Sequence, residues 1–116
     1  MKLHLFFEKL KILRVTHWIK NTIIFFPLIF SNNFIDTANL MLAVKIFFHF
    51  CLLSSAVYIF NDLLDLEKDK IHPLKKFRPL AKNILNIKEA IFLHIFLIIL
   101  SLFFISKDII FISITY

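Results

Sequence analysis

Long, nearly uncharged apolar segments constrain this chain more than any other feature of its sequence. Hydrophobic residues make up 59% of the 116 positions, and sixteen of them are phenylalanines. The mean hydropathy is +0.82. A soluble domain of this size could not bury so much apolar surface, so lipid is the expected solvent. The sequence therefore predicts an all-α integral membrane protein, folded as a helical bundle.

The apolar segments predict about three transmembrane helices and the start of a fourth. The expected helices are residues 16–31, 38–69 and 87–105, with a fourth beginning at 109–116. The first is short for the roughly twenty residues that a span usually needs. Pro27 should kink this first span or break its hydrogen bonding near the far end. Residues 3–13 pair apolar positions with lysines, which is typical of a short amphipathic helix at the membrane surface.

Polar residues mark the expected ends of these helices. Asp36 or Thr37 can cap the second helix, and Asn86 with Glu89 can form a capping box for the third. Residues 31–36 and Ser106-Lys107-Asp108 are expected to form turns. A basic loop over residues 70–86 joins the second helix to the third, and its two prolines prevent the helix from continuing.

The basic residues indicate how the chain crosses the membrane. They gather before the first span (Lys2, Lys9, Lys11, Arg14, Lys20) and between the second and third (Lys68, Lys70, Lys75, Lys76, Arg78, Lys82, Lys88). The other two turns hold only Lys107. By the positive-inside rule, the N-terminus and the basic loop are both cytoplasmic, in a bacterial-type inner membrane. Lys45 and His49, inside the second helix, are expected to face another helix or to snorkel to the interface.

Three aspartates at helical spacing give the strongest functional signal. On a continuous helix Asp62, Asp65 and Asp69 fall within about 60° of one another, and Ser55 and Tyr58 extend the same stripe. Ionised carboxylates near a bilayer are costly unless a cation neutralises them, and oxygen-only ligands suit Mg²⁺. Mg²⁺ usually takes one or two carboxylates together with substrate phosphates. The stripe therefore predicts a Mg²⁺–diphosphate site, with these three aspartates as metal ligands and catalytic residues. The alternative is a helix that leaves the membrane with its charges in water.

Basic side chains on the same membrane face could bind the phosphates. Lys20, Lys75, Lys76 and Arg78 can meet phosphate oxygens, and Arg78 suits a bidentate contact. The alternative for Lys75, Lys76 and Lys82 is a role in topology and in binding anionic headgroups. The sequence contains no nucleophile–base pair, glycine-rich phosphate loop or Cys/His metal spacing. This inventory favours transfer chemistry in which Mg²⁺ stabilises a departing diphosphate.

The acidic segment also resembles a known motif. Residues 61–69 (Asn-Asp-Leu-Leu-Asp-Leu-Glu-Lys-Asp) resemble the first aspartate-rich motif, N-D-x-x-D-x-x-x-D, of the UbiA superfamily of intramembrane prenyltransferases. Trp18-Ile19-Lys20-Asn21 and residues 69–81 resemble one branch, the decaprenyl-phosphate phosphoribosyltransferases. The resemblance implies a bundle of about nine spans around a central cavity, with a second aspartate-rich motif in later helices.

The resemblance also implies roles for individual residues. Asp62, Asp65 and Asp69 would hold Mg²⁺ and diphosphate. The candidate substrate-binding residues are Lys20, Asn21, Tyr58, Asn61, Lys75 and Arg78. The chain departs from the family pattern at Val15, where the family usually has proline, and at Lys82-Asn83, where it usually has Ser-Gly. Asn83 can supply the left-handed backbone conformation that glycine would give.

The expected activity is Mg²⁺-dependent transfer of phosphoribose from phosphoribosyl diphosphate to a polyprenyl (decaprenyl) phosphate. Two alternatives remain: prenyl transfer from a polyprenyl diphosphate to an aromatic acceptor, and a non-catalytic membrane subunit or remnant. Residues 1–116 are expected to form a single N-terminal portion of a UbiA-type domain. The expected partners are the bilayer, the two substrates and a separate C-terminal half. Nucleic acid is not expected despite the net charge of +6, because the basic residues follow the membrane topology.

Overall fold

The computed structural model describes residues 1–31 and 35–115, with side chains placed up to residue 105. These residues form α-helices and 3-10 helices in this order: α1 (Lys2–Leu10), η1 (Lys11–Leu13), η2 (Val15–Phe25), α2 (Phe26–Phe30), α3 (Thr37–Leu64), α4 (Leu66–Ile71), η4 (Lys75–Phe77) and α5 (Ile87–Thr115). The predicted all-helical class is confirmed. Asn32, Asn33 and Phe34 of the expected first turn, and Tyr116, lie outside the described residues.

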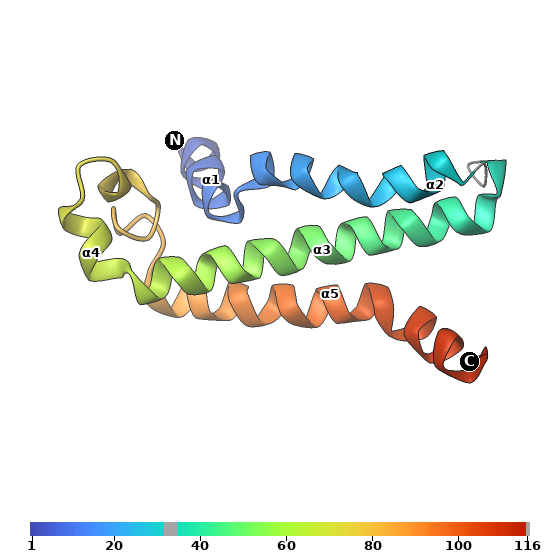
Figure 1. Cartoon of the computed structure of the whole chain (residues 1–116). Coiled ribbons are helices and arrows are strands. Elements are labelled where there is room, and N and C mark those ends of the chain that lie inside the picture. Colours follow the sequence, from blue (N-terminus) through green and yellow to red (C-terminus); the bar gives the residue numbers. More distant parts are fainter. Residues whose placement is uncertain (32–34, 116) are drawn as a thin grey trace.

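Three long helical segments run side by side, with α3 in the middle (Figure 1). The segment η2–α2 lies on one side of α3, and α5 lies on the other. Both α3 and α5 are long and apolar enough to cross a membrane, with mean hydropathies of 2.0 and 2.2, whereas Val15–Phe30 is a shorter apolar helix. The buried core lies toward one end, between α3, α5, η1 and the 70–86 loop: Ile12, Ala56, Ile59, Leu80, Leu85, Ala90 and Leu97.

The first span is mostly a 3-10 helix, and this geometry explains how so short a segment can match its neighbour. The eleven residues of η2 rise about 2.0 Å each and cover about 22 Å. Contacts at its two ends, Arg14 with Asp62 and Phe25 with Phe47, match a stretch of α3 of about the same length. Together η2 and α2 cover about 30 Å, close to the hydrocarbon thickness of a bilayer. Pro27 lies in the first turn of α2, where a proline is tolerated, so it marks the change from 3-10 to α geometry.

The predicted helix caps are confirmed. The Asp36 side chain caps α3 by accepting a hydrogen bond of 3.0 Å from the backbone N–H of Ala38. Asn86 and Glu89 form the reciprocal capping box of α5, at 2.8 Å and 3.1 Å. Asn83 has φ 58°, the left-handed conformation expected of it.

The second helix does not run without interruption from 38 to 69 as predicted. It ends at Leu64, Asp65 leaves helical geometry with φ −94° and ψ 8°, and α4 restarts at Leu66. Aspartate is a weak helix former in mid-helix positions, and Asp69 on the restarted turn is paired with Arg78 at 2.7 Å. Because of this break, the three aspartates do not lie on one continuous helical face.

The predicted turn at Ser106-Lys107-Asp108 is also wrong. The backbone of α5 stays helical through these residues to Thr115, so the expected fourth helix is an extension of α5. The segment contains no glycine or proline, so nothing in its backbone chemistry prevents helical hydrogen bonding. Figure 1 shows α5 bending toward its C-terminal end.

Candidate functional site

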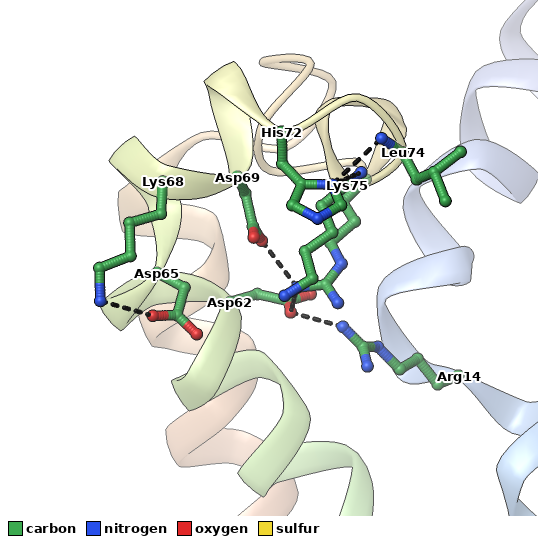
Figure 2. A network of polar contacts seen from close by, with 9 residues as sticks. Arg14, Asp62, Asp65, Lys68, Asp69, His72, Leu74 and Lys75 are labelled. Atoms are coloured by element: carbon green, nitrogen blue, oxygen red, sulfur yellow. Dashed lines mark hydrogen bonds and ion pairs between the residues drawn. The ribbon is translucent and has the colours of Figure 1, made fainter.

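Two arginines and two aspartates from distant parts of the chain meet at one end of the bundle. Arg14 Nη2 lies 2.5 Å from Asp62 Oδ1, and Arg78 Nη1 lies 2.9 Å from the same oxygen. Arg78 Nη1 also lies 2.7 Å from Asp69 Oδ2, so it bridges the two acids. Figure 2 shows Asp62 and Asp69 turned toward the same space, with Arg14 entering from the opposite side. We call these four residues the Arg–Asp cluster.

Local backbone geometry positions both arginines. Arg14 has φ 49° and ψ 47°, an uncommon left-handed conformation for a residue with a side chain, and it joins η1 to η2. Its guanidinium carbon also lies 4.6 Å from the centre of the Tyr58 ring, in a cation–π contact. Arg78 follows η4 in an extended conformation, as expected for a residue that precedes proline.

The cluster is buried and its formal charges cancel. Asp62 and Asp69 are each only 2% exposed, whereas both arginines reach partly to the surface. Buried carboxylates are costly unless they are paired and hydrogen-bonded. Among the described residues, every fully buried polar side-chain atom has a hydrogen-bond partner. The arginines therefore supply the neutralising charge that the sequence analysis assigned to a cation.

The third predicted metal ligand does not join the other two. Asp65 is 45% exposed at its side chain and pairs with Lys68 at 3.7 Å. Figure 2 shows this pair on the side of the helix away from Arg14. Among the side chains that the structure describes, in residues 1–31 and 35–105, no group of three His, Cys, Asp or Glu is close enough to hold a metal ion. The break at Asp65 is the physical reason, since it takes this carboxylate off the line of Asp62.

The cluster nevertheless fits a Mg²⁺ ion that brings its own phosphate ligands. The arginine bonds use Oδ1 of Asp62 and Oδ2 of Asp69, which leaves the second oxygen of each carboxylate outside these bonds. Mg²⁺ typically binds one or two carboxylates and completes its coordination with water and phosphate oxygens. The oxygen donors present suit this mode of binding and would not form an all-protein metal cage.

Next to the cluster, the polar stripe of α3 packs against the N-terminal segment. Trp18 Nε1 donates to Ser55 Oγ at 2.9 Å, and Ser55 Oγ donates to the carbonyl of Leu13 at 2.6 Å. Tyr58 Oη lies 3.4 Å from His17 Nδ1. Ser55 and Tyr58, which the sequence analysis placed on the acidic stripe, therefore fasten η1 and η2 to α3.

Asn21 lies apart from the cluster. Its side-chain amide donates to Cys51 Sγ at 3.4 Å, and Cys51 is about 16 Å from Asp62 along α3. Here Asn21 and Tyr58 line an apolar cavity of about 340 Å³, together with Phe50, Leu53, Ser54 and Val57. Of the predicted substrate-binding residues, Arg78 is thus in the cluster, and Asn21 and Tyr58 line this cavity.

The remaining predicted substrate-binding residues lie at the surface. Lys20, Asn61 and Lys75 are exposed. The Asn61 carbonyl accepts the backbone hydrogen bond of Asp65 at 2.9 Å. The backbone N–H of Lys75 donates to His72 Nδ1 at 3.2 Å, which ties down the start of the loop that carries Arg78.

The sequence analysis missed Arg14, His17 and Trp18 as partners of the acidic stripe. A signal was present, because residues 14, 17, 18 and 21 repeat at the spacing of one helical face. Their partners Asp62, Tyr58, Ser55 and Cys51 follow in reverse order along α3, at intervals of three or four residues. Two complementary polar stripes in apolar segments indicate that the segments pair antiparallel.

Comparisons with known proteins agree with the motif. The UbiA prenyltransferase family is matched over residues 22–115. The decaprenyl-phosphate phosphoribosyltransferase of Corynebacterium glutamicum is 37% identical over 95 residues, which cover 80% of this chain and 29% of that protein. The protein with this name in Mycolicibacterium smegmatis is 37% identical over 79 residues, covering 65% of this chain and 25% of the relative.

A protein with another name is also similar. Nodulation protein NoeC of Azorhizobium caulinodans is 33% identical over 87 residues, covering 75% of this chain and 28% of that protein. The chain thus spans less than a third of the length of each of these relatives. No solved structure matches the chain.

Proposed function

The chain belongs to the UbiA prenyltransferase family, and we propose that it forms the first part of a membrane transferase whose donor is a diphosphate ester. The preferred donor is phosphoribosyl diphosphate, and the preferred acceptor is a polyprenyl phosphate such as decaprenyl phosphate. In the reaction an oxygen of the lipid phosphate attacks C1 of the ribose, the bond between C1 and the diphosphate breaks, and diphosphate departs. Positive charge develops at C1 as this bond breaks.

The Arg–Asp cluster is the observation that carries this proposal. It brings two guanidinium groups and two carboxylates, each with one oxygen outside the arginine bonds, to one end of the bundle. Carboxylates suit the metal, and guanidinium groups suit phosphate oxygens. The cluster therefore offers groups for both parts of a metal–diphosphate donor. The relatives named decaprenyl-phosphate phosphoribosyltransferase, which cover most of this chain, favour phosphoribose over a prenyl group.

Each residue of the cluster has a distinct role in this proposal. Asp62 and Asp69 would hold Mg²⁺, which when bound would stabilise the negative charge of the departing diphosphate. Arg78 binds diphosphate oxygens through its planar fork, and exposed Lys75 lies on the loop just before it. Lys20, also exposed, serves the phosphate of the lipid acceptor. Asp65, which pairs with Lys68, and the exposed Asn61 have no assigned contact with the donor.

The proposed orientation follows from the basic residues. If the N-terminus and the 70–86 loop are cytoplasmic, the cluster opens to the compartment that supplies a soluble phosphorylated sugar. The apolar faces of η2, α3 and α5 then lie at the depth of the polyprenyl chain. This arrangement brings a water-soluble donor and a lipid acceptor to the same end of the bundle.

A chimaeric enzyme tests the proposal. Residues 1–116 replace the corresponding part of the Corynebacterium glutamicum relative, and membranes are incubated with radiolabelled phosphoribosyl diphosphate and decaprenyl phosphate. We expect a labelled lipid whose formation needs Mg²⁺ and falls at least about 100-fold with Asp62→Asn. The matched control is Asp36→Asn, which changes an aspartate at the opposite end of α3.

The outcomes separate the three candidate functions. A labelled product from a polyprenyl diphosphate and an aromatic acceptor, with none from phosphoribosyl diphosphate, would support the prenyltransferase alternative. An inserted chimaera that is inactive with both donors, beside an active parent enzyme, would contradict a catalytic role for this segment and favour the non-catalytic remnant.

A further inference from the structure

Arg14 differs from the other basic residues of the N-terminal segment because its charge is turned into the protein. Its side chain is 20% exposed, whereas that of Lys11 is 63% exposed and pairs only with Glu8. The guanidinium is held between the Asp62 carboxylate and the face of the Tyr58 ring. A role in membrane topology would not require this burial, since topology depends on charge near the membrane ends alone.

The two arginines hold Asp62 in different ways. Both donate to Oδ1 of Asp62, but only Arg78 also contacts Asp69. If Arg78 turns toward the phosphates of a donor, Arg14 remains as the counter-ion of Asp62. Removing the last partner from a buried carboxylate is strongly destabilising, so Arg14 provides a counter-ion that keeps Asp62 oriented while Arg78 binds elsewhere.

The backbone around Arg14 is fastened to α3 at several points. Ile12 is 1% exposed in the core, and the carbonyl of Leu13 accepts a hydrogen bond from Ser55. One turn further along, Trp18 donates to the same serine. A change in the bond between Arg14 and Asp62 is therefore transmitted to Trp18, which is the only tryptophan in the sequence.

We propose that Arg14 is a positioning residue for the donor site: it holds Oδ1 of Asp62 so that the other oxygen faces the metal. It thereby couples binding of a Mg²⁺–diphosphate group to docking of the N-terminal segment on α3. This inference rests on the proposed function for the identity of the ligand. The docking itself rests only on the contacts described above.

The first test uses the full chain in lipid nanodiscs without ligand. Arg14→Gln should shift the Trp18 emission to longer wavelength, because the segment loosens and the indole gains contact with water. Asp62→Asn should give a similar shift, and the double variant should shift little beyond either single variant. The control Lys11→Gln also removes one positive charge and should leave the emission unchanged. Fully additive shifts, or no shift with Arg14→Gln, would overturn the docking.

The second test adds inorganic pyrophosphate and Mg²⁺. Wild-type protein should show a saturable change in Trp18 emission that requires both. Arg14→Gln should weaken pyrophosphate binding by about 10- to 100-fold, the usual effect of losing a charge-assisted hydrogen bond. It should also raise the Mg²⁺ concentration at the midpoint. Arg14→Lys should restore part of the affinity, and Lys11→Gln should stay within about twofold of wild type.

The results distinguish this inference from the proposed function. Wild-type protein that binds no Mg²⁺–pyrophosphate would contradict the proposed function and remove the coupling with it. Binding by wild type that Arg14→Gln retains in full, at the same Mg²⁺ midpoint, would overturn the positioning role alone. If Arg14→Gln loses its helical circular dichroism, the test relies on Arg14→Lys. A pyrophosphate affinity equal to that of wild type in Arg14→Lys would overturn the positioning role of Arg14.

Discussion

Helix α3 has two partners, and it is joined to them by different chemistry. Two polar contacts toward α5, both among the described side chains, end on backbone atoms: His49 Nδ1 lies 2.9 Å from the carbonyl of Ser101, and His94 Nδ1 lies 2.8 Å from that of Ala56. Because a carbonyl only accepts, each histidine donates from Nδ1. Toward the N-terminal segment the contacts include side-chain pairs, such as Arg14 with Asp62 and Trp18 with Ser55.

The difference lies in how far each interface depends on particular side chains. A bond to a backbone carbonyl does not depend on the side chain of the residue that supplies it, so these two bonds alone do not fix the identity of Ala56 or Ser101. The N-terminal face depends on specific pairs, and its charged pairs lie at the end where the donor is proposed to bind. We therefore expect substitutions on the N-terminal face to alter ligand binding, and those on the α5 face to alter stability alone.

The largest effect is expected for Arg78→Gln. This variant leaves two buried carboxylates with Arg14 as their one remaining cationic partner in the cluster. Loss of one partner from a buried ion pair typically costs about 3 kcal/mol or more. Unfolding by SDS in mixed micelles, followed by Trp18 fluorescence, measures this change. Lys76→Gln on the same loop should change the free energy of unfolding by less than about 0.5 kcal/mol; equal effects of the two variants would show that the cluster is not buried as described.

Two adjacent serines provide a smaller and better-matched comparison. Ser55→Ala removes the bonds to Trp18 and to the carbonyl of Leu13, whereas Ser54 bonds only to the carbonyl of Cys51 on its own helix. We expect Ser55→Ala to cost about 1–2 kcal/mol of unfolding free energy and Ser54→Ala to cost less than about 0.5 kcal/mol. The same SDS titration measures both, and similar values would argue against close packing of η2 on α3.

The α5 face is tested by His94→Phe. The new ring can keep the stacking on Phe60, at a present centroid distance of 5.5 Å, but it cannot donate to Ala56. The unfolding free energy should fall by about 0.6–1 kcal/mol, as is usual for one hydrogen bond between membrane helices. Pyrophosphate affinity should be unchanged. A large loss of affinity in this variant would remove the distinction between the two faces.

The smallest effect is expected at the membrane surface, where Glu8 pairs with Lys11. The hydrogen bond from Lys11 is the main cause that holds the pKa of the Glu8 carboxyl below its ordinary 4.5. A lowered pKa in the folded state contributes stability above the unfolded-state pKa, and this contribution is lost as pH falls through the folded-state value. NMR titration of the carboxyl carbon should show the lowered pKa, and Lys11→Gln should raise it toward the ordinary value. If Lys11→Gln measurably changed the unfolding midpoint at pH 7, the placement of the Glu8–Lys11 pair at the protein surface would be contradicted.

Local patterns predicted most of the fold. Apolar run length located α3 and α5, and the capping residues Asp36, Asn86 and Glu89 marked helix starts that the structure confirms. Asn83 was predicted to take the left-handed conformation and does so. These features depend on neighbouring residues only, which is why the sequence reveals them. The wrong turn at 106–108 came from reading polar residues as a stop signal where the backbone had none.

The features that the sequence did not reveal depend on distant partners. Arg14 and Asp62 are 48 positions apart, so the pair becomes visible only when two distant polar stripes are compared, and no pattern within one segment marks it. The break at Asp65 and the 3-10 form of η2 likewise follow from contacts with Arg78 and α3. The triad of aspartates was predicted from an unbroken helix, and the structure brings together Asp62 and Asp69 while Asp65 faces Lys68.

The mixed geometry of the first span has a consequence for how its length can change. Inserting one residue into η2 displaces its end by about 2.0 Å, whereas one residue added to α3 displaces that helix by about 1.5 Å. The two helices differ in rise per residue, and they contact each other at Arg14–Asp62 and Phe25–Phe47. An insertion of one residue in one helix therefore cannot be cancelled by an insertion of one residue in the other. We therefore expect this hairpin to accept changes of residue type readily and changes of residue number hardly at all.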